Sequence, residues 1–445
     1  MVIAKETKTR KKGVSLMAII PQISLFSWSE IENLGDLERL RLVLEYMPDE
    51  NLMIKLEKLR KNGRDDYPIR AMWNSVLAGI VFQHPTTESL RRELSRNGQL
   101  RCMCGFKNSK VPPEWAYTRF LKNLFKCKGD INEIFKNLVE SIKKELPDFG
   151  KDLAMDSKAI QSLSTHYNKN SNPDGRRDTD ADYGKKEYKG IREDGTLWEK
   201  VVKWFGYKIH LIVDENYELP VEYMITKASA SDIKTGHELV KQLAEAQPEI
   251  IEDCETLEAD RGYDDAKLNI KLYDEFGIKP VIDTRVMRKE ETEYKKNIFY
   301  DEKGEVYCYC METGTKREMR CGGFDKDRNT LKKLCSAEHY GIKCACYDKC
   351  QYKSGIRIPL GTDRRIFTPI DRASYKWEKY YDKRTSVERV NSRLDVSFGF
   401  ENHYIRGMQK MKTRCGLALC VMLAMALGRV KEKRQDLMRS LVKTA

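Results

Sequence analysis

The sequence predicts an α/β protein with a mixed sheet flanked by helices, an all-helical N-terminal domain and a cysteine-rich insertion. Apolar residues recur at helical spacing up to about residue 148, and short apolar runs then alternate with helical segments up to about residue 283. Seven cysteines fall between Cys308 and Cys350. We therefore expect a helical domain at 23–148, an α/β domain at 149–283 and 376–433, an insertion at 284–375, and basic tails at 1–22 and 434–445.

The charge of the chain points to a polyanionic partner. Its 445 residues carry a formal net charge of +13, and 33% of them are charged. Nucleic acid or an anionic membrane surface would satisfy this balance. The longest apolar run, Cys415 to Leu427, is too short to span a bilayer and suits a buried helix. Nucleic acid is therefore the expected partner, and no membrane is expected.

The N-terminus lacks the order of a signal peptide, so we expect a cytoplasmic protein in which disulfides are rare. The cysteines are then buried thiols or metal ligands. The tail at 1–22 is either disordered or an auxiliary contact to phosphates through its basic residues, which are Lys5, Lys8, Arg10, Lys11 and Lys12.

The region 23–148 reads as a series of helices. Leu37, Leu40 and Leu44 recur at spacings of three and four, and prolines precede the later helical segments 68–82, 85–94 and 112–124. Two short helices around a glycine-containing turn could read DNA as a helix-turn-helix, or could simply be a packing unit. Both readings remain open, and we expect this domain to bind DNA.

From residue 150 the pattern becomes strand-like. The run 151–156 ends in Asp156, and 204–214 with 219–226 form a predicted hairpin. A helix at 232–246, a strand ending in Asp260, a helix at 265–276 and a strand at 277–283 complete a mixed order. A polar excursion at 171–195 interrupts it, and an apolar helix at 408–433 is expected to pack under the sheet.

One later helix, 380–394, brings Tyr381, Arg384 and Glu388 onto one face. By itself this is most simply an exposed ion pair, worth about 0.3–0.5 kcal/mol. An acid at the end of a strand is likewise common as a cap. The combination is sharper, because adjacent strands would bring Asp156 and Asp260 together while the helix adds Glu388. Three close carboxylates call for cations, and two Mg²⁺ or Mn²⁺ ions would support phosphoryl transfer.

The chain resembles the DDE transposases of bacterial insertion sequences, within the ribonuclease-H-like and integrase superfamily. The motifs that carry the resemblance are Ala154-Met-Asp-Ser157, Gly206-Tyr-Lys-Ile-His210, Ala259-Asp-Arg-Gly-Tyr-Asp264 and Arg384-Thr-Ser-Val-Glu-Arg389. The helical signature Tyr-x2-Arg-x3-Glu-x6-Lys matches at Tyr381, Arg384 and Glu388. Asp395 stands where the signature has Lys, which puts one flanking-DNA contact in doubt, and neither Lys383 nor Arg393 has the expected spacing to replace it.

The resemblance implies a ribonuclease-H-like catalytic domain in which Asp156, Asp260 and Glu388 bind the metal ions. Tyr381 and Arg384 would contact DNA near the cleaved phosphate. The implied enzyme binds the terminal inverted repeats of its element as a homodimer, cleaves DNA strands and transfers them to target DNA in the bacterial cytoplasm. Two alternatives remain open: a ribonuclease-H-like nuclease without strand transfer, and a non-catalytic zinc-containing DNA-binding protein whose acids are structural.

The cysteine cluster suits a structural Zn²⁺ held by Cys310, Cys335, Cys344 and Cys350, with Cys308 as the alternative to Cys310. The spacing lacks paired Cys-x2-Cys knuckles, so scattered free thiols are an equal reading. On the hairpin, His210 alternates with Ile209 and Leu211, which favours a hydrogen-bonded sheet histidine over a metal ligand. Trp377 is either a packing anchor or a platform on which a base stacks.

Overall fold

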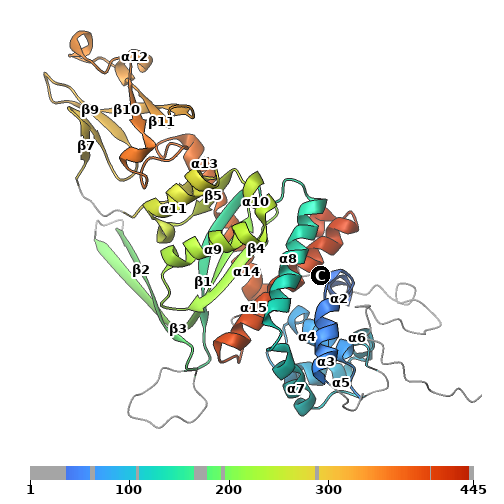
Figure 1. Ribbon diagram of the computed structural model, residues 1–445. Coiled ribbons are helices and arrows are strands. Elements are labelled where there is room, and N and C mark those ends of the chain that lie inside the picture. The colour runs from blue at the N-terminus through green and yellow to red at the C-terminus, as the bar shows by residue number, and fades with distance from the viewer. Residues whose placement is uncertain are drawn as a thin grey trace, which may run out of the picture. The chain divides into compact units, whose positions relative to one another are not determined.

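The computed structural model describes residues 37–60, 66–106, 110–164, 178–191, 196–285, 290–400 and 402–439 (Figure 1). Its contacts divide the chain into two compact units. The first comprises Met1–Ser141, Leu394–Ile405 and Gln409–Ala445, and the second Ile142–Arg393 and Arg406–Met408. The expected tail at 1–22 lies outside the described residues, as do the end of the tail at 434–445 and much of the polar excursion.

The first unit is helical. Its elements are α2 (Leu37–Tyr46), α3 (Glu50–Arg60), α4 (Ile69–Val81), α5 (Thr87–Arg96), α6 (Gly98–Cys104), α7 (Glu114–Leu124), most of α8 (Lys128–Glu145), nearly all of α15 (Met408–Lys431) and the 3₁₀ turn η5 (Gln435–Leu437). Helix α4 is buried along nearly its whole length. Thr86 caps α5 by accepting a hydrogen bond from the Ser89 backbone N–H. The helical pattern predicted from the apolar spacing is confirmed for these segments.

A buried ionic network anchors α4. Arg70 Nη1 donates to Asp49 Oδ1 and Trp73 Nε1 donates to Asp49 Oδ2, each with a donor–acceptor distance of 2.5 Å. Asp49 is fully buried, and burial raises the pKa of its carboxyl above the usual range. Both side chains of the ion pair are buried, so removing either partner would leave an uncompensated charge in the core.

Helix α15 groups with the first unit, whereas the sequence placed 376–433 in the α/β domain. The physical reason is the set of partners along the helix. Cys420 Sγ donates a hydrogen bond to the Ile131 carbonyl at a distance of 3.8 Å, and Arg429 pairs with Glu38 at 2.9 Å. By length and composition α15 is one helix that could cross a membrane, but its most apolar window is 94% buried within the protein. That burial is typical of a core helix.

The second unit is built on a six-stranded mixed sheet, here named the first sheet. Its strands are β1 (Asp152–Gln161), β2 (Asp182–Ile191), β3 (Leu197–Asp214), β4 (Leu219–Lys227), β5 (Thr256–Ala259) and β6 (Lys279–Ile282). The long β3 pairs antiparallel with β1, β2 and β4, while β5 pairs parallel with β1 and with β6. The spatial order β4-β3-β1-β5-β6 confirms the predicted hairpin and mixed sheet.

Short helices connect the strands that follow β4. They are α9 (Asp232–Ala246), α10 (Pro248–Asp253), the 3₁₀ turn η1 (Arg261–Tyr263), α11 (Ala266–Ile270) and the π turn η2 (Lys271–Glu275). Figure 1 shows α9, α10 and α11 on the same face of the first sheet. Apolar residues of α9 face inward, with Leu239, Val240 and Leu243 fully buried.

Two local expectations were wrong. Strand β2 lies inside the segment expected to be an irregular polar excursion, where it pairs with the first half of β3. The single helix expected at 380–394 is two helices, α13 (Tyr375–Lys383) and α14 (Thr385–Phe398), which meet at Arg384. Ser374 caps α13 by accepting a hydrogen bond from the Trp377 backbone N–H. No Pro or Gly marks the junction at Arg384, so the residue pattern alone could not reveal it.

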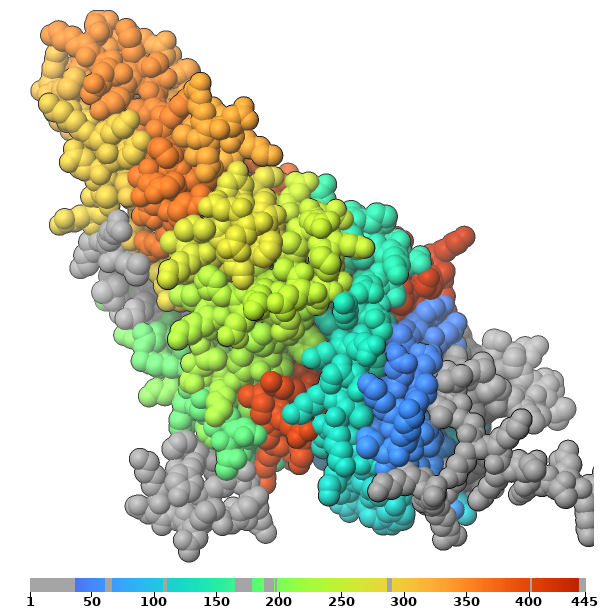
Figure 2. Space-filling model, in the orientation of Figure 1, coloured from blue at the N-terminus to red at the C-terminus, as the bar shows by residue number. Residues whose placement is uncertain are grey.

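The insertion forms a second sheet, which the sequence did not predict. Its strands are β7 (Thr292–Lys295), β8 (Ile298–Tyr300), β9 (Val306–Tyr309), β10 (Lys316–Asp325), β11 (Thr330–Leu334) and β12 (Ile356–Pro359), all antiparallel in the order β12-β11-β10-β9-β8-β7. Short elements complete it: α12 (Ser336–Tyr340), η3 (Tyr347–Lys349) and η4 (Leu360–Thr362). Its buried core centres on Ile298, Val306, Leu331, Ile358 and Phe367. Figure 2 shows the surface of the insertion as adjoining yellow and orange atoms.

Candidate active site

Asp156 and Asp260 stand beside each other in the first sheet, although β1 continues past Asp156 to Gln161 and does not end at the acid as expected. Strands β1 and β5 are parallel neighbours, and Met155 is aligned with Ala259. The next residue on each strand is therefore an acid, and the two acids stand beside each other. Asp260 also caps η1, because its Oδ1 accepts the Gly262 backbone N–H at 2.8 Å. The register of β1 with β5 therefore places the two acids side by side, as expected from the sequence.

The two acids interact electrostatically. Burial raises the pKa of Asp156 to about 6, and the negative charge of Asp260 adds to the shift. Two cations oppose it, Lys186 of β2 and Arg384. The Lys186 ammonium donates to the Ser157 carbonyl at 3.3 Å, which holds it beside the acid pair. The charges of two acids and two cations therefore interact at this part of the sheet.

A stack of rings and guanidinium groups leads from the insertion to Arg384. The rings of Trp377 and Tyr381 stack with centroids 4.8 Å apart and planes 12° apart. Arg372 lies over the Trp377 ring at 5.3 Å, and Arg384 lies over the Tyr381 ring at 5.5 Å. Such contacts fix planar groups with little loss of entropy. Trp377 is thus a packing anchor in this structure, and it orients Tyr381.

Glu388 lies one turn beyond Arg384, and its Oε1 is 2.8 Å from Arg384 Nη2. Its side chain is 53% exposed. Because Arg384 also interacts with the charge of Asp156, its guanidinium serves both Glu388 and Asp156. Helix α14 is tied to the β3–β4 turn, where Glu218 pairs with Arg389 at 2.6 Å and with Arg393.

The structure brings Asp156 and Asp260 together, but it does not gather all three acids into one ligand cluster. Across the described ranges, the one set of three or more His, Cys, Asp or Glu ligand atoms within 4.8 Å of each other belongs to Cys310, Cys344 and Cys346. Arg384 accounts for the difference, because its guanidinium supplies the positive charge that the carboxylates need. The strand-end pair fits divalent cations through its hard oxygen donors and its mutual repulsion. Glu388 could join them once Arg384 releases it.

Neither residue considered as a substitute for the missing lysine is available for DNA in this structure. Lys383 lies 3.5 Å from both Asp152 and Glu215, and Arg393 donates to Glu218 through its carboxylate and its carbonyl. Both cations hold the second unit together. The contact that the signature assigns to Lys therefore has no counterpart at these two positions.

His210 lies near the acids but behaves as a sheet residue. It is fully buried, with Nδ1 3.3 Å from the Tyr263 hydroxyl and Nε2 3.0 Å from the Thr226 hydroxyl. Burial lowers the pKa of His210 to about 4. A neutral imidazole with both nitrogens partnered agrees with the structural reading of this residue.

The cysteines predicted to bind zinc are divided between two places in one cavity. Cys310 and Cys344 lie together with Cys346, which the prediction omitted. Cys335 and Cys350 line the same cavity without joining this trio. The omission came from weighing long spacings such as Cys335-x8-Cys344. The short Cys344-x-Cys346 step was the sequence signal for the trio.

Two further residues of the candidate active site were missed. Lys186 lies on β2, which was not predicted, and Arg372 lies in the stretch assigned to the insertion. Arg372 is buried and donates to the carbonyls of Ile282 and Arg365, so it links the end of β6 to the start of α13. Only the sheet topology reveals both roles, because neither residue belongs to a recognisable motif.

The mixed α/β unit thus sets Asp156 of β1 beside Asp260, which follows the parallel strand β5, and the pair Arg384–Glu388 lies at the junction of α13 and α14. The model of the transposase DDE domain family matches residues 149–424, more than half of the chain. The chain therefore belongs to the transposase DDE domain family, and the protein is a DDE-type transposase.

The other comparisons add little. The chain is similar to a piggyBac transposase from a cryo-EM synaptic complex with hairpin DNA, at a TM-score of 0.40 and 10% identity, over 93% of this chain and 80% of that one. No curated protein sequence matches the chain.

Proposed function

We propose that this transposase binds the ends of a bacterial insertion sequence, cleaves DNA strands there and joins them to target DNA. The observation that carries the proposal is the alignment of Met155 with Ala259, which sets Asp156 and Asp260 side by side. The strand order β4-β3-β1-β5-β6 supports a ribonuclease-H-like core, since three antiparallel strands are followed by two that run parallel to β1.

In this proposal Asp156, Asp260 and Glu388 would hold two Mg²⁺ or Mn²⁺ ions. When bound, the ions would activate a water or 3′-hydroxyl and stabilise the leaving oxygen. The donor set supports this assignment, because all three are carboxylates and the two strand-end acids repel each other. No nucleophilic side chain is required.

Arg384 has a second role in the proposal. Its guanidinium pairs with Glu388 and interacts with Asp156, and a phosphate of bound DNA would offer it a stronger partner. Transfer of Arg384 to the phosphate would release Glu388 toward the strand-end acids. Tyr381, held between Trp377 and Arg384, would lie against the same phosphate and fix the guanidinium plane.

The experiment uses the full-length protein with a duplex that carries one inverted-repeat end of the element and with Mg²⁺. Asp156→Asn, Asp260→Asn and Glu388→Gln should each lower strand cleavage at least about 100-fold, since a metal ligand should matter no less than the groups that orient one. Binding of the duplex should remain. Cleavage that persists in all three variants contradicts the proposal.

Glu222→Gln is the matched control. Glu222 is a buried acid of the same sheet on β4, and burial raises its pKa to about 7. Its Oε1 accepts hydrogen bonds from Gln242 and the Tyr223 backbone N–H. A neutral amide of the same shape should therefore preserve both fold and cleavage.

Strand joining separates the proposed transposase from a nuclease. Precut ends with a free 3′-hydroxyl, incubated with a supercoiled plasmid, should become covalently attached to it. Hydrolysis without joining would favour the nuclease alternative. The proposal also includes a homodimer on two ends and DNA binding by the helices of the first unit. Light scattering of the DNA complex should then give two chains.

A further inference from the structure

Six cysteines of the insertion surround one small cavity. The cavity has a volume of about 30 Å³ and is lined by Cys308, Cys310, Cys335, Cys344, Cys346 and Cys350. The thiols come from two parts of the chain that are distant in sequence. Cys308 and Cys310 belong to β9 and the residue after it, while the others lie in the segment between β11 and β12. A group bound among them would join these two parts.

The spacing of three of the thiols fits one tetrahedral ion. The sulfur atoms of Cys310, Cys344 and Cys346 lie within 4.8 Å of one another, and those of Cys344 and Cys346 are 3.7 Å apart. A zinc–thiolate bond of about 2.3 Å gives an edge of about 3.8 Å between two ligands of a tetrahedron. A disulfide would require about 2.05 Å. The observed separation therefore matches co-ligands of a metal and not a covalent bond.

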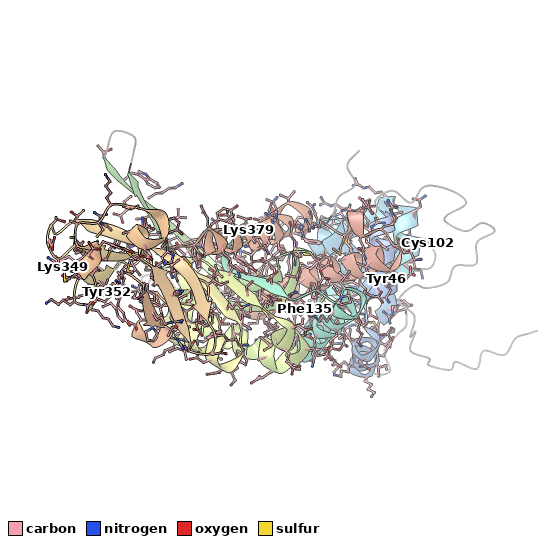
Figure 3. The ribbon with its side chains drawn as sticks, turned by 90° about the horizontal axis from the view of Figure 1, so that it is seen from above. Tyr46, Cys102, Phe135, Lys349, Tyr352 and Lys379 are labelled. Carbon is pink, nitrogen blue, oxygen red and sulfur yellow. The ribbon has the colours of Figure 1, made fainter. Side chains whose placement is uncertain are left out.

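The segment around these thiols contains little regular structure and takes no part in the apolar core of the insertion. Between Cys335 and Tyr352 it contains only α12 and η3, and residues 338–343 are exposed. The apolar core of the insertion draws no buried residue from 336–350. Figure 3 labels Lys349 and Tyr352 in this part of the chain. Small segments without a core are commonly held by a metal cross-link.

We propose that Cys310, Cys344 and Cys346 hold a structural zinc ion, with one thiolate of Cys308, Cys335 or Cys350 as the fourth ligand. This inference goes beyond the proposed function and stands whether or not the protein joins DNA strands. It also revises the ligand set expected from the sequence. Cys346 is now one of the three central thiols, and at most one of Cys335 and Cys350 remains as a ligand.

The first test is metal analysis of the full-length protein, purified under reducing conditions without chelator. About one equivalent of zinc per chain is expected, and it should fall below about one tenth of that in Cys310→Ser, Cys344→Ser and Cys346→Ser. Cys321→Ser is the matched control, because Cys321 lies in β10 of the same sheet and does not line the cavity. Undiminished zinc in all three trio variants, or iron in place of zinc, overturns the proposal.

The second test needs no variant and so does not depend on how well a variant folds. The native protein is alkylated with iodoacetamide, with and without prior treatment with a zinc chelator, and the modified cysteines are identified by mass spectrometry. Cys344 should be protected several-fold before chelation and react afterwards. Equal reactivity in both samples, or a Cys344–Cys346 disulfide in the untreated protein, contradicts a zinc site here.

Discussion

The two sheets of the second unit are held together by different forces. The first sheet buries apolar strands, and Leu153, Met155, Leu211 and Leu257 are all fully excluded from solvent. The second sheet has mostly shorter strands, and it combines a smaller apolar core with buried ion pairs. Lys333 is fully buried and pairs with Asp371 at 2.7 Å, and Arg365 bridges Asp264 and Glu302 at 2.9 and 2.6 Å.

The difference shows how one chain can hold the candidate active site on a mainly apolar sheet beside an insertion that contains buried ion pairs. An apolar core fixes the strand ends that bear Asp156 and Asp260. The insertion adds a few buried ion pairs to its apolar core, and each pair is costly to break because one partner would remain buried. Loss of one interaction should therefore damage the second sheet more than loss of one apolar side chain damages the first.

The largest effect is expected for Asp371→Ala. It would leave the Lys333 ammonium buried without a counter-charge and lower the free energy of unfolding by about 3–5 kcal/mol. Urea denaturation measures this loss. The double variant Lys333→Met with Asp371→Leu removes both charges and should recover most of it. A single variant as stable as the wild type would contradict the charge-based account of this sheet.

A smaller loss in the free energy of unfolding, of about 3 kcal/mol, is expected for Leu257→Ala in β5. Leu257 is fully buried, and truncation removes apolar contacts and leaves a cavity. Leu257→Met is the volume-conserving control and should cost less than about 1.5 kcal/mol. Denaturant midpoints compare the two variants. If the methionine variant lost as much as the alanine variant, packing would not be what stabilises this strand.

His210 makes the stability of the first sheet depend on pH. Its folded pKa of about 4 lies below the unfolded value of about 6.5, so the unfolded chain binds the proton more readily between these two values. Its contribution to stability is complete above pH 6.5 and falls by up to about 3 kcal/mol as the pH drops to 4. His210→Gln should remove this part of the pH dependence. An unchanged pH profile in the variant would show that His210 is not buried neutral.

The smallest effect is expected for Arg357→Ala in β12. Arg357 pairs with Asp325 at 2.5 Å, but its side chain is 40% exposed. Solvent screens such a pair, so the loss should be about 0.5 kcal/mol. Thermal unfolding of this variant and of Asp371→Ala would compare the loss of an exposed ion pair with the loss of a buried one in the same sheet. A loss near that of Asp371→Ala would remove the distinction.

The sequence allowed the apolar part of this fold to be predicted, and much less of the polar part. Strands β1 and β5 were recognisable because each contains a short apolar run followed by an acid, although β1 continues beyond Asp156 to Gln161. Strand β2 was missed because its charged residues, among them Lys185, Lys186 and Glu187, leave it without an apolar face. The insertion strands were missed for the same reason, since charged residues interrupt them.

At the candidate active site, the sequence predicted which acids are involved but not how they are arranged. The pairing of Asp156 with Asp260 followed from adjacent strands. The guanidinium of Arg384 supplies positive charge beside the acids in place of a metal ion. Its position depends on the break between α13 and α14 and on the ring stack that includes Trp377. Those features arise from tertiary packing, which has no signature in the local pattern of residues.

The most direct test of the central claim is calorimetric titration of the DNA-free protein with Mn²⁺. The account predicts binding in the wild type that is lost in the double variant Asp156→Asn with Asp260→Asn and kept in Glu222→Gln. Because the variants would be examined without DNA, the result does not depend on which ends the enzyme recognises. Mn²⁺ binding of equal affinity and stoichiometry in the double variant would contradict the assignment of the strand-end acids as metal ligands.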